Sequence, residues 1–248
     1  MKENLNKIIS QNSNYPRRKV EALLKEGKIK LNNKIANPGD KFSYGDKVEV
    51  LGKELEVREN KKCLYIKLNK PVGYVCSNKN FKEEKNIFSL VKRKEKLFSI
   101  GRLDKNSRGI IILTNDGDLA YELSHPKFEH KKVYIVKTKE ENKDKKIAEK
   151  FIKGIDIKQK TLAKARDFKE LSKNKFKITL SEGKKRQIRE MFRELDLQVS
   201  DLKRTSFSQV ELGDLKEGEY KELSSEEIEK LKLFAVLNNI NKEKTKNK

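Results

Sequence analysis

The sequence has few cysteines and few histidines. Its 248 residues include only two of each. Cys63 and Cys76 lie in separate strand-like segments and resemble neither a disulfide framework nor a zinc site. His125 and His130 are too few for a metal centre unless carboxylates complete it. The shortage argues against a disulfide-rich scaffold and against a zinc-dependent fold.

Long apolar segments are missing as well. No stretch approaches the roughly 20 apolar residues that a membrane-spanning helix requires. The first residues, from Met1 to Leu5, lack the apolar core of a signal peptide. No basic amphipathic helix carries the large aromatic side chains typical of binding to a membrane surface. We therefore expect a cytoplasmic protein that has no membrane partner.

Positive charge, in contrast, is abundant. The chain contains 60 Lys and Arg residues against 38 Asp and Glu residues, which gives a net charge of +22. A bias toward Lys codons explains Lys in place of Arg, but it does not explain an imbalance of this size. Such an excess favours a polyanionic partner, with nucleic acid ahead of an anionic membrane.

Residues 1–58 have the pattern of a small α/β module, with two short amphipathic helices followed by short strands. Arg17, Arg18 and Lys19 stand at the start of the second helix, where the helix dipole disfavours cations. A cationic cluster in this place is easier to understand if it contacts phosphate groups, which suggests RNA binding. A solvated surface run explains this segment equally well.

A polar linker separates this module from a larger domain, residues 62–240. Strands are expected near 63–68, 97–103, 110–113, 133–138, 162–168, 176–180 and 205–212, and helices near 116–124, 144–153, 184–195 and after the capping box at Ser224 and Glu227. This alternation indicates an α+β fold with a mixed, mainly antiparallel sheet flanked by helices. Residues 241–248 form a Lys-rich tail that we expect to be disordered.

The most informative segment is a polar loop between two strand-like stretches. It reads Gly101-Arg102-Leu103-Asp104-Lys105-Asn106-Ser107-Arg108-Gly109, and an aliphatic run and Thr114-Asn115-Asp116-Gly117 follow it. If extended geometry persists through Leu103, then Arg102 and Asp104 point to one side and Leu103 points into the core. Catalytic groups often lie on loops anchored between strands, although a lone Asp there is more often a turn or cap residue.

This segment resembles the signature of the bacterial ribosomal RNA pseudouridine synthases that act on single sites in 16S or 23S rRNA. Other family patterns are present as Asn69-Lys70-Pro71-Val72-Gly73, His125-Pro126, Lys132-Val133-Tyr134-Ile135-Val136 and Glu182-Gly183-Lys184-Lys185-Arg186-Gln187-Ile188-Arg189-Glu190-Met191. The resemblance covers nearly the whole chain. Residues 1–58 resemble an RNA-binding module first described in a small-subunit ribosomal protein. One departure is Asn32-Asn33, where the family often has Asn-Gly, but Asn tolerates the left-handed backbone angles of such a turn.

The resemblance implies that uracil is cut from its ribose, rotated and rejoined through carbon. The base must first be extruded from its stack, and a carboxylate then stabilises or attacks the electron-poor sugar. It implies Asp104 as this carboxylate, Arg189 as the ion-pair partner that keeps it charged, and Tyr134 as the side chain that stacks on uracil. Whether Asp104 attacks the sugar, attacks the base or removes a sugar proton stays open. Without the family match, Tyr134 is interpreted as a core tyrosine and Arg189 as a solvated charge.

The same resemblance places further residues at the substrate. Arg102 fills the space of the flipped base or holds a phosphate, and Ile188 packs on the uracil edge or in the core. Lys184 and Arg186, which belong to the family pattern at residues 182–191, are also assigned to substrate binding. No metal and no cofactor are implied, because the reaction centre becomes cationic and the product is an isomer.

The implied partner is ribosomal RNA. The segments Gln187-Ile188-Arg189 and Leu202-Lys203-Arg204-Thr205 favour 23S over 16S rRNA, and a monomer is the default. A non-catalytic RNA-binding factor, for instance in ribosome assembly, is the alternative that charge and the first module support equally.

Overall fold

The computed structural model describes residues 2–58, 62–77, 83–124, 130–158 and 161–246, with side chains as far as residue 236. The chain divides into two compact units, Met1–Lys62 and Cys63–Lys248. Within the described ranges, no helix is long and apolar enough to cross a membrane. His125 and Pro126 of the family pattern lie outside the described residues.

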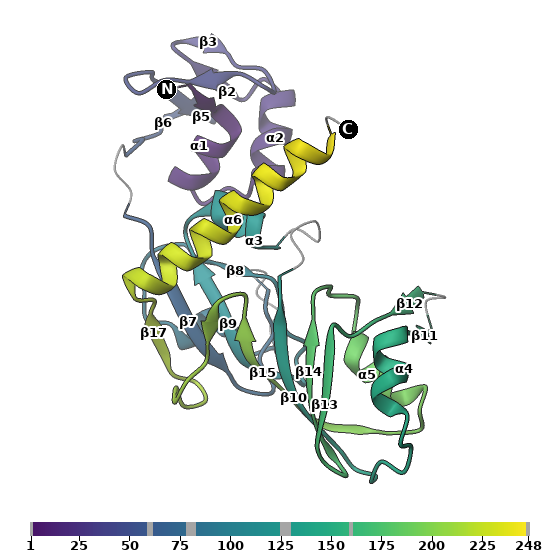
Figure 1. The fold of residues 1–248 in the computed structure, drawn as a ribbon. Helices are drawn as coiled ribbons and strands as arrows, with labels where there is room; N and C mark the ends of the chain where they lie inside the picture. Colours follow the sequence, from purple (N-terminus) through teal and green to yellow (C-terminus); the bar gives the residue numbers. More distant parts are fainter. Residues whose placement is uncertain (1, 59–61, 78–82, 125–129, 159–160, 247–248) are drawn as a thin grey trace. The chain divides into compact units, whose positions relative to one another are not determined.

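The first unit combines two helices with two small sheets (Figure 1). Strands β1 (Glu3–Asn4) and β4 (Lys41–Phe42) pair, and β3 (Lys34–Ile35), β2 (Ile29–Leu31), β5 (Val48–Val50) and β6 (Lys53–Glu54) follow one another in the second sheet. Helices α1 (Leu5–Asn12) and α2 (Arg17–Lys25) bury apolar residues spaced three and four apart, because that spacing gathers them on one helix face. Asn32 and Asn33 both have positive φ, at 50° and 65°, as a tight hairpin turn requires.

The second unit is built on a mixed sheet. Its strands are β7 (Tyr65–Lys70), β8 (Phe98–Ile100), β9 (Arg108–Thr114), β10 (Lys132–Thr138), β13 (Asp167–Ser172), β14 (Lys175–Leu180), β15 (Val199–Phe207), β16 (Val210–Glu211) and β17 (Tyr220–Glu222). The main order is β13-β14-β10-β15-β9-β7-β17, with β16 beside β15 and β8 beside β9. Only β15 and β9 pair in parallel among these strands. The predicted mixed, mainly antiparallel sheet is confirmed.

Helices pack on both faces of this sheet. The elements are a short 3-10 helix η1 (Ile87–Leu90), α3 (Gly117–Ser124), α4 (Ile147–Lys153), α5 (Gln187–Arg193), α6 (Ser225–Lys246) and a separate hairpin of β11 (Ile155–Ile157) and β12 (Thr161–Ala163). Phe151 of α4 and Phe192 of α5 share a core with Val136 of β10. Leu119 of α3 and Leu231 of α6 share another core with residues of β9. The two cores lie at different parts of the sheet, and the first one carries the candidate site.

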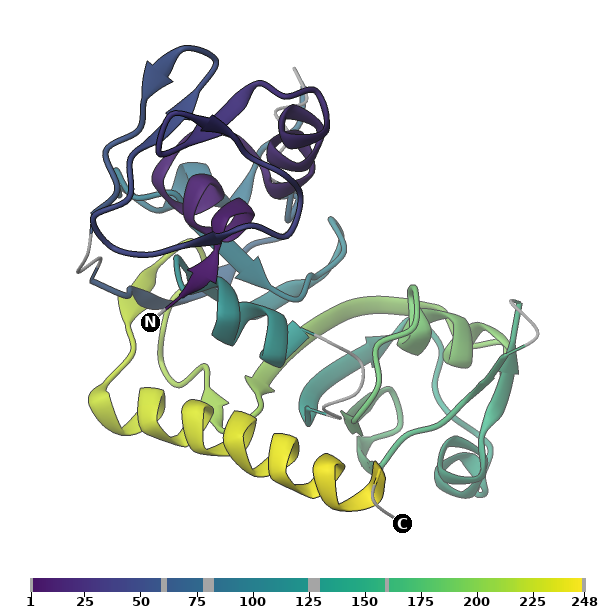
Figure 2. The same ribbon diagram turned by 90° about the horizontal axis from the view of Figure 1, so that it is seen from above.

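The last helix is longer than the sequence predicted (Figure 2). Residues 241–246, which we expected to be disordered, continue α6 instead. The capping box holds its start, since the Ser224 amide donates to Glu227 Oε2 at 3.0 Å and the Glu227 amide donates to Ser224 Oγ at 3.2 Å. No Gly or Pro follows before Lys246, so nothing in the chain breaks the helix.

Candidate active site

Asp104 lies on the loop between β8 and β9, half-buried, beside a buried Leu103. Arg102 is exposed, so the alternation predicted for these three residues is present. Leu103 packs in one apolar cluster with Tyr134 of β10 and Ile188 of α5. The loop, the strand and the helix that carry the three predicted catalytic residues therefore converge on one place.

The carboxylate of Asp104 makes no hydrogen bond or ion pair with any residue that the structure describes. Its backbone carbonyl accepts a bond from the Ser107 amide at 3.0 Å, which closes the loop as a turn. Burial lowers the pKa of both Lys70 and Arg189, and the negative charge of Asp104 acts in the opposite direction on each. The carboxylate is therefore held in the electric field of two cations while its oxygens stay available.

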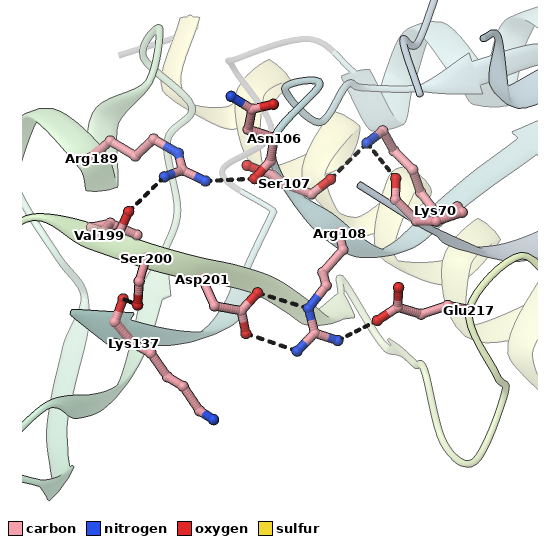
Figure 3. Close-up of polar contacts among 11 residues, drawn as sticks. Lys70, Asn106, Ser107, Arg108, Lys137, Arg189, Val199, Ser200, Asp201 and Glu217 are labelled. Atoms are coloured by element: carbon pink, nitrogen blue, oxygen red, sulfur yellow. Dashed lines mark hydrogen bonds and ion pairs between the residues drawn. The ribbon is translucent and has the colours of Figure 1, made fainter. Parts of the chain in front are cut away.

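Arg189 binds the loop rather than the carboxylate itself (Figure 3). Its Nη2 donates to the Asn106 carbonyl at 2.6 Å, and its Nη1 donates to the Val199 carbonyl at 3.1 Å. Its Nε is buried and has no hydrogen-bond partner among the described residues. The direct Asp104–Arg189 ion pair that we expected is not formed in the described structure, and the two terminal nitrogens donate to backbone carbonyls instead. Arg189 instead fixes the backbone two residues beyond Asp104.

Lys70 holds the same loop from the opposite direction (Figure 3). It is fully buried at the end of β7, and its Nζ donates to the carbonyls of Ser107 at 2.6 Å, Pro71 at 3.0 Å and Lys105 at 3.4 Å. Burial lowers its pKa to about 8. Sequence reasoning gave Lys70 no role beyond a family motif. Its place between an apolar strand and a proline was the only available signal.

Cys76 supports the residue before Asp104. Its Sγ lies 3.4 Å from the Leu103 carbonyl oxygen and 3.5 Å from the Leu103 amide nitrogen. Burial raises the pKa of this thiol, which keeps it protonated and able to donate. Side chains from other elements thus bind the backbone on both sides of Asp104, at the amide and carbonyl of Leu103 before it and at the carbonyls of residues 105–107 after it.

Tyr134 is 8% exposed and sits on β10 opposite Arg204 of β15. A bulge between Val133 and Tyr134 interrupts the strand register directly before it, and bulges often redirect a side chain at a functional site. The side chain packs in the same apolar cluster as Leu103 and Ile188 and keeps a small exposed area. This placement suits a ring that stacks on a base.

The parallel pairing of β9 with β15 explains Gly109. Arg204 is 1% exposed, and its Nε donates to the Ile110 carbonyl at 2.8 Å. Gly109 lies opposite Arg204, and a Cβ added there would come 2.1 Å from the Arg204 carbonyl oxygen. Only glycine allows this approach, which places the loop of Asp104 against the strand that borders Tyr134.

The family pattern at residues 182–191 begins as a turn and continues as a helix. Helix α5 starts at Gln187, three residues later than predicted, and Arg186 precedes it with a left-handed φ of 53°. Lys184 Nζ donates to the Leu162 carbonyl at 2.6 Å and pairs with Glu182 at 2.8 Å. The buried Gln187 side chain also binds Glu182, at 2.7 Å. The turn is fixed internally, and the exposed Arg186 is left beside Ile188 and Arg189.

The predicted RNA-binding residues of the first unit are accessible. Arg17, Arg18 and Lys19 form the first turn of α2 and are all exposed, with Pro16 before them and no acidic residue in that turn. The structure describes no ion pair for any of the three. Their charge is therefore not balanced within the described part of the unit.

The half-buried Asp104 carboxylate, on a loop held by Lys70 and Arg189, is the kind of group that nucleophilic and acid–base enzymes use. A family model described as RNA pseudouridylate synthase matches residues 64–194. The chain is 36% identical over 242 residues to the dual-specificity RNA pseudouridine synthase RluF of Escherichia coli K12, covering 96% of this chain and 81% of that protein. It is 35% identical to ribosomal large subunit pseudouridine synthase B of Bacillus subtilis, covering 94% and 97% of the two chains.

A solved structure agrees with these sequence comparisons. A crystal structure of a pseudouridylate synthase superposes with a TM-score of 0.67 at 30% identity, covering 92% of this chain and 99% of the other. The chain belongs to the RNA pseudouridylate synthase family. It is a pseudouridine synthase, an isomerase that converts uridine in RNA to pseudouridine.

Proposed function

We propose that this enzyme modifies a specific uridine of ribosomal RNA, with 23S favoured over 16S, and that Asp104, Tyr134 and Arg189 carry the reaction. The placement of Asp104 is the observation that supports it best: a half-buried carboxylate with no partner among the described residues, in the field of Lys70 and Arg189. The Bacillus subtilis relative is named for the large ribosomal subunit, which supports the choice of 23S rRNA.

The reaction begins with a uridine turned out of its stack into the site. Tyr134 stacks on the extruded uracil and Ile188 packs against its edge. As the bond from uracil to the anomeric carbon breaks, positive charge grows on the sugar, and the adjacent Asp104 carboxylate stabilises it or bonds to it. Arg189 and Lys70 hold the loop that carries Asp104 and place two positive charges near its carboxylate.

Exposed cations around the site receive the RNA. Arg102 lies next to Asp104 on the solvent side and occupies the space of the flipped base or binds a phosphate. Arg186 projects from a strained turn beside the site, and strained backbone is often kept at functional sites. Lys184 has a smaller role, because its ammonium is already engaged with Glu182 and a backbone carbonyl.

The first unit adds affinity for RNA. Arg17, Arg18 and Lys19 are exposed without described ion pairs at a helix start, where the helix dipole alone disfavours them. Phosphate contacts from this turn explain their position. The enzyme acts in the cytoplasm as a monomer and needs no metal or cofactor.

Mapping pseudouridines in rRNA from cells with and without this protein tests the proposal. We expect one or a few sites, in 23S rRNA, to be lost without the protein and restored with it. An unchanged map of both 23S and 16S rRNA would contradict the assignment to ribosomal RNA.

A further inference from the structure

Four neighbouring strands of the second unit present one apolar face and one basic face. Phe168 of β13, Phe176 of β14 and Val136 of β10 point into the core that α4 and α5 cover. Side chains alternate along a strand, so the residues between them point to the other face. Figure 1 shows α4 and α5 grouped at one side of β13 and β14.

The opposite face carries a cluster of lysines, here called the basic sheet face. Its members are Lys137, Lys169, Lys175, Lys177 and Lys203. Strand pairing aligns them: Lys169 is opposite Lys177, and Lys137 is opposite Lys175. Ile135 lies between Lys177 and Lys203 in the same row. With neighbouring strands about 4.8 Å apart, the row from Lys169 to Lys203 extends roughly 14 Å.

These pairings are costly for the free protein. Like charges directly opposite each other on adjacent strands destabilise a sheet, and two such Lys–Lys pairs occur here. None of the five lysines forms an ion pair with a residue that the structure describes. A lysine on an edge strand protects it from pairing with another chain, but this explains only Lys169, because β14, β10 and β15 are interior strands.

The nearest acidic residues neutralise the face only in part: Asp201 lies directly opposite Lys137, and the charge of Lys137 helps to lower the pKa of Asp201. Asp201 of β15 is bound by Arg108, which donates from Nε and Nη2 at 2.7 and 2.8 Å (Figure 3). Glu217 accepts from the remaining arm of the same guanidinium at 2.6 Å. Among these strands, the other acidic side chain on the basic sheet face is Asp167 of the edge strand β13, two residues before Lys169. Five lysines therefore retain a clear positive excess.

The basic sheet face is also open to solvent. Lys137, Lys169 and Lys177 are exposed, and Lys175 and Lys203 are half-buried. Leu103, Tyr134 and Ile188 pack in the core below α4 and α5, so the basic sheet face lies across the sheet from the candidate active site. A uridine bound at Asp104 does not bring its own phosphates to these lysines.

We propose that the basic sheet face binds the phosphate backbone of the ribosomal RNA at a position remote from the modified uridine. Lysine ammonium groups on flexible stems make phosphate contacts that are independent of base sequence. A surface that is repulsive alone becomes favourable when it releases counterions from a polyanion. This inference rests on the proposed rRNA substrate and adds a second contact region to it.

The test compares two triple variants with the same loss of charge. Lys137→Gln/Lys169→Gln/Lys177→Gln neutralises the basic sheet face, and Lys145→Gln/Lys153→Gln/Lys158→Gln neutralises three exposed lysines elsewhere in the second unit. Each protein is titrated, over a range of salt concentrations, with a short stem-loop containing the target uridine and with a long rRNA transcript. Pseudouridine formation is measured on both RNAs.

We expect the basic-face variant to bind the long transcript about tenfold more weakly at moderate salt. The slope of log affinity against log salt concentration should be less steep by about 2 to 3, as expected when three phosphate contacts are lost. For the short stem-loop, the affinity and the rate of modification by this variant should stay within about twofold of the wild type. For the control variant, both quantities should stay within about twofold of the wild type on both RNAs. The Tm of the basic-face variant should not fall, because its substitutions remove like charges that face each other.

An unchanged affinity and salt slope for the long transcript would overturn the inference. An equal loss of affinity in the control variant would also overturn it, because net charge alone would then explain the effect. An equal loss of affinity for the short stem-loop would overturn it as well. A wild-type enzyme that formed no pseudouridine in either RNA would instead count against the proposed function. The binding comparison would still decide whether the basic sheet face contacts RNA.

Discussion

Arg189 donates to the carbonyl of Asn106 at 2.6 Å, and this contact joins helix α5 to the loop of Asp104. The guanidinium thus acts on the carboxylate by position and by field, without a hydrogen bond between the two groups in the RNA-free enzyme. Lys70 completes the arrangement by binding the carbonyls on either side of Asn106. The loop of Asp104 is therefore organised in the RNA-free protein.

Arg189→Lys should keep the charge but lose one of the two carbonyl contacts, because an ammonium does not reproduce the planar fork of a guanidinium. We expect kcat to fall about a hundredfold, as for a small misplacement of a catalytic group, with KM changing little. Single-turnover kinetics with saturating RNA measure this. Wild-type kcat in this variant would show that the fork is not needed.

Lys70→Met should destabilise the second unit by about 3 kcal/mol, because it removes the donor of the buried Ser107 carbonyl and two weaker contacts to the Pro71 and Lys105 carbonyls. Urea unfolding measures the change. Lys153→Met is the control, since that lysine is exposed on α4, and it should alter the free energy of unfolding by less than about 0.5 kcal/mol. Equal effects of the two substitutions would argue against the role of Lys70.

Stability should depend on pH through two lysines, the buried Lys70 and the half-buried Lys132. Burial lowers the pKa of Lys70 and of Lys132 to about 8, from an ordinary value of 10.5. Between these values the unfolded chain binds more protons than the folded one, so the free energy of unfolding contributed by each lysine rises with pH. Lys132→Met should flatten this rise when urea unfolding is compared at several pH values in the window. A slope identical to that of the wild type would contradict the lowered pKa.

Gly109→Ala should not be tolerated at the crossing of β9 and β15. The new Cβ would meet the Arg204 backbone at 2.1 Å, and φ at this position is 106°. We expect a loss of about 3 kcal/mol or more, or no soluble protein. Gly117→Ala is the matched control: its nearest neighbour is 3.9 Å away, and thermal unfolding should show unchanged or slightly higher stability.

Much of the fold was predictable because apolar periodicity determines which side chains are buried. The helices around Val20 and Phe192 were expected from the spacing of apolar residues, and the strand at Ile110 from a continuous apolar run. The parallel pairing of β9 with β15 was not, because it joins residues that are 95 positions apart, such as Arg108 and Lys203, and no local pattern encodes it. That pairing is what places the loop of Asp104 near Tyr134.

The site was predictable where residues form motifs and not where they act by burial. Asp104, Tyr134 and Arg189 stood in recognisable patterns, and the structure brings their elements together. Nothing in the local sequence indicates that Lys70 is fully buried, since lysine is usually exposed. The expected direct bond from Arg189 to Asp104 was wrong, because side-chain reach alone does not reveal competing backbone carbonyls.

The most direct test of the account is pseudouridine formation by Asp104→Asn, which keeps the size and shape of the side chain but removes its charge. The substituted protein and the wild type are incubated with the same rRNA fragment, and pseudouridine and RNA binding are both measured. The account predicts wild-type affinity and Tm with no detectable pseudouridine. Pseudouridine formed by Asp104→Asn at the wild-type rate would contradict it.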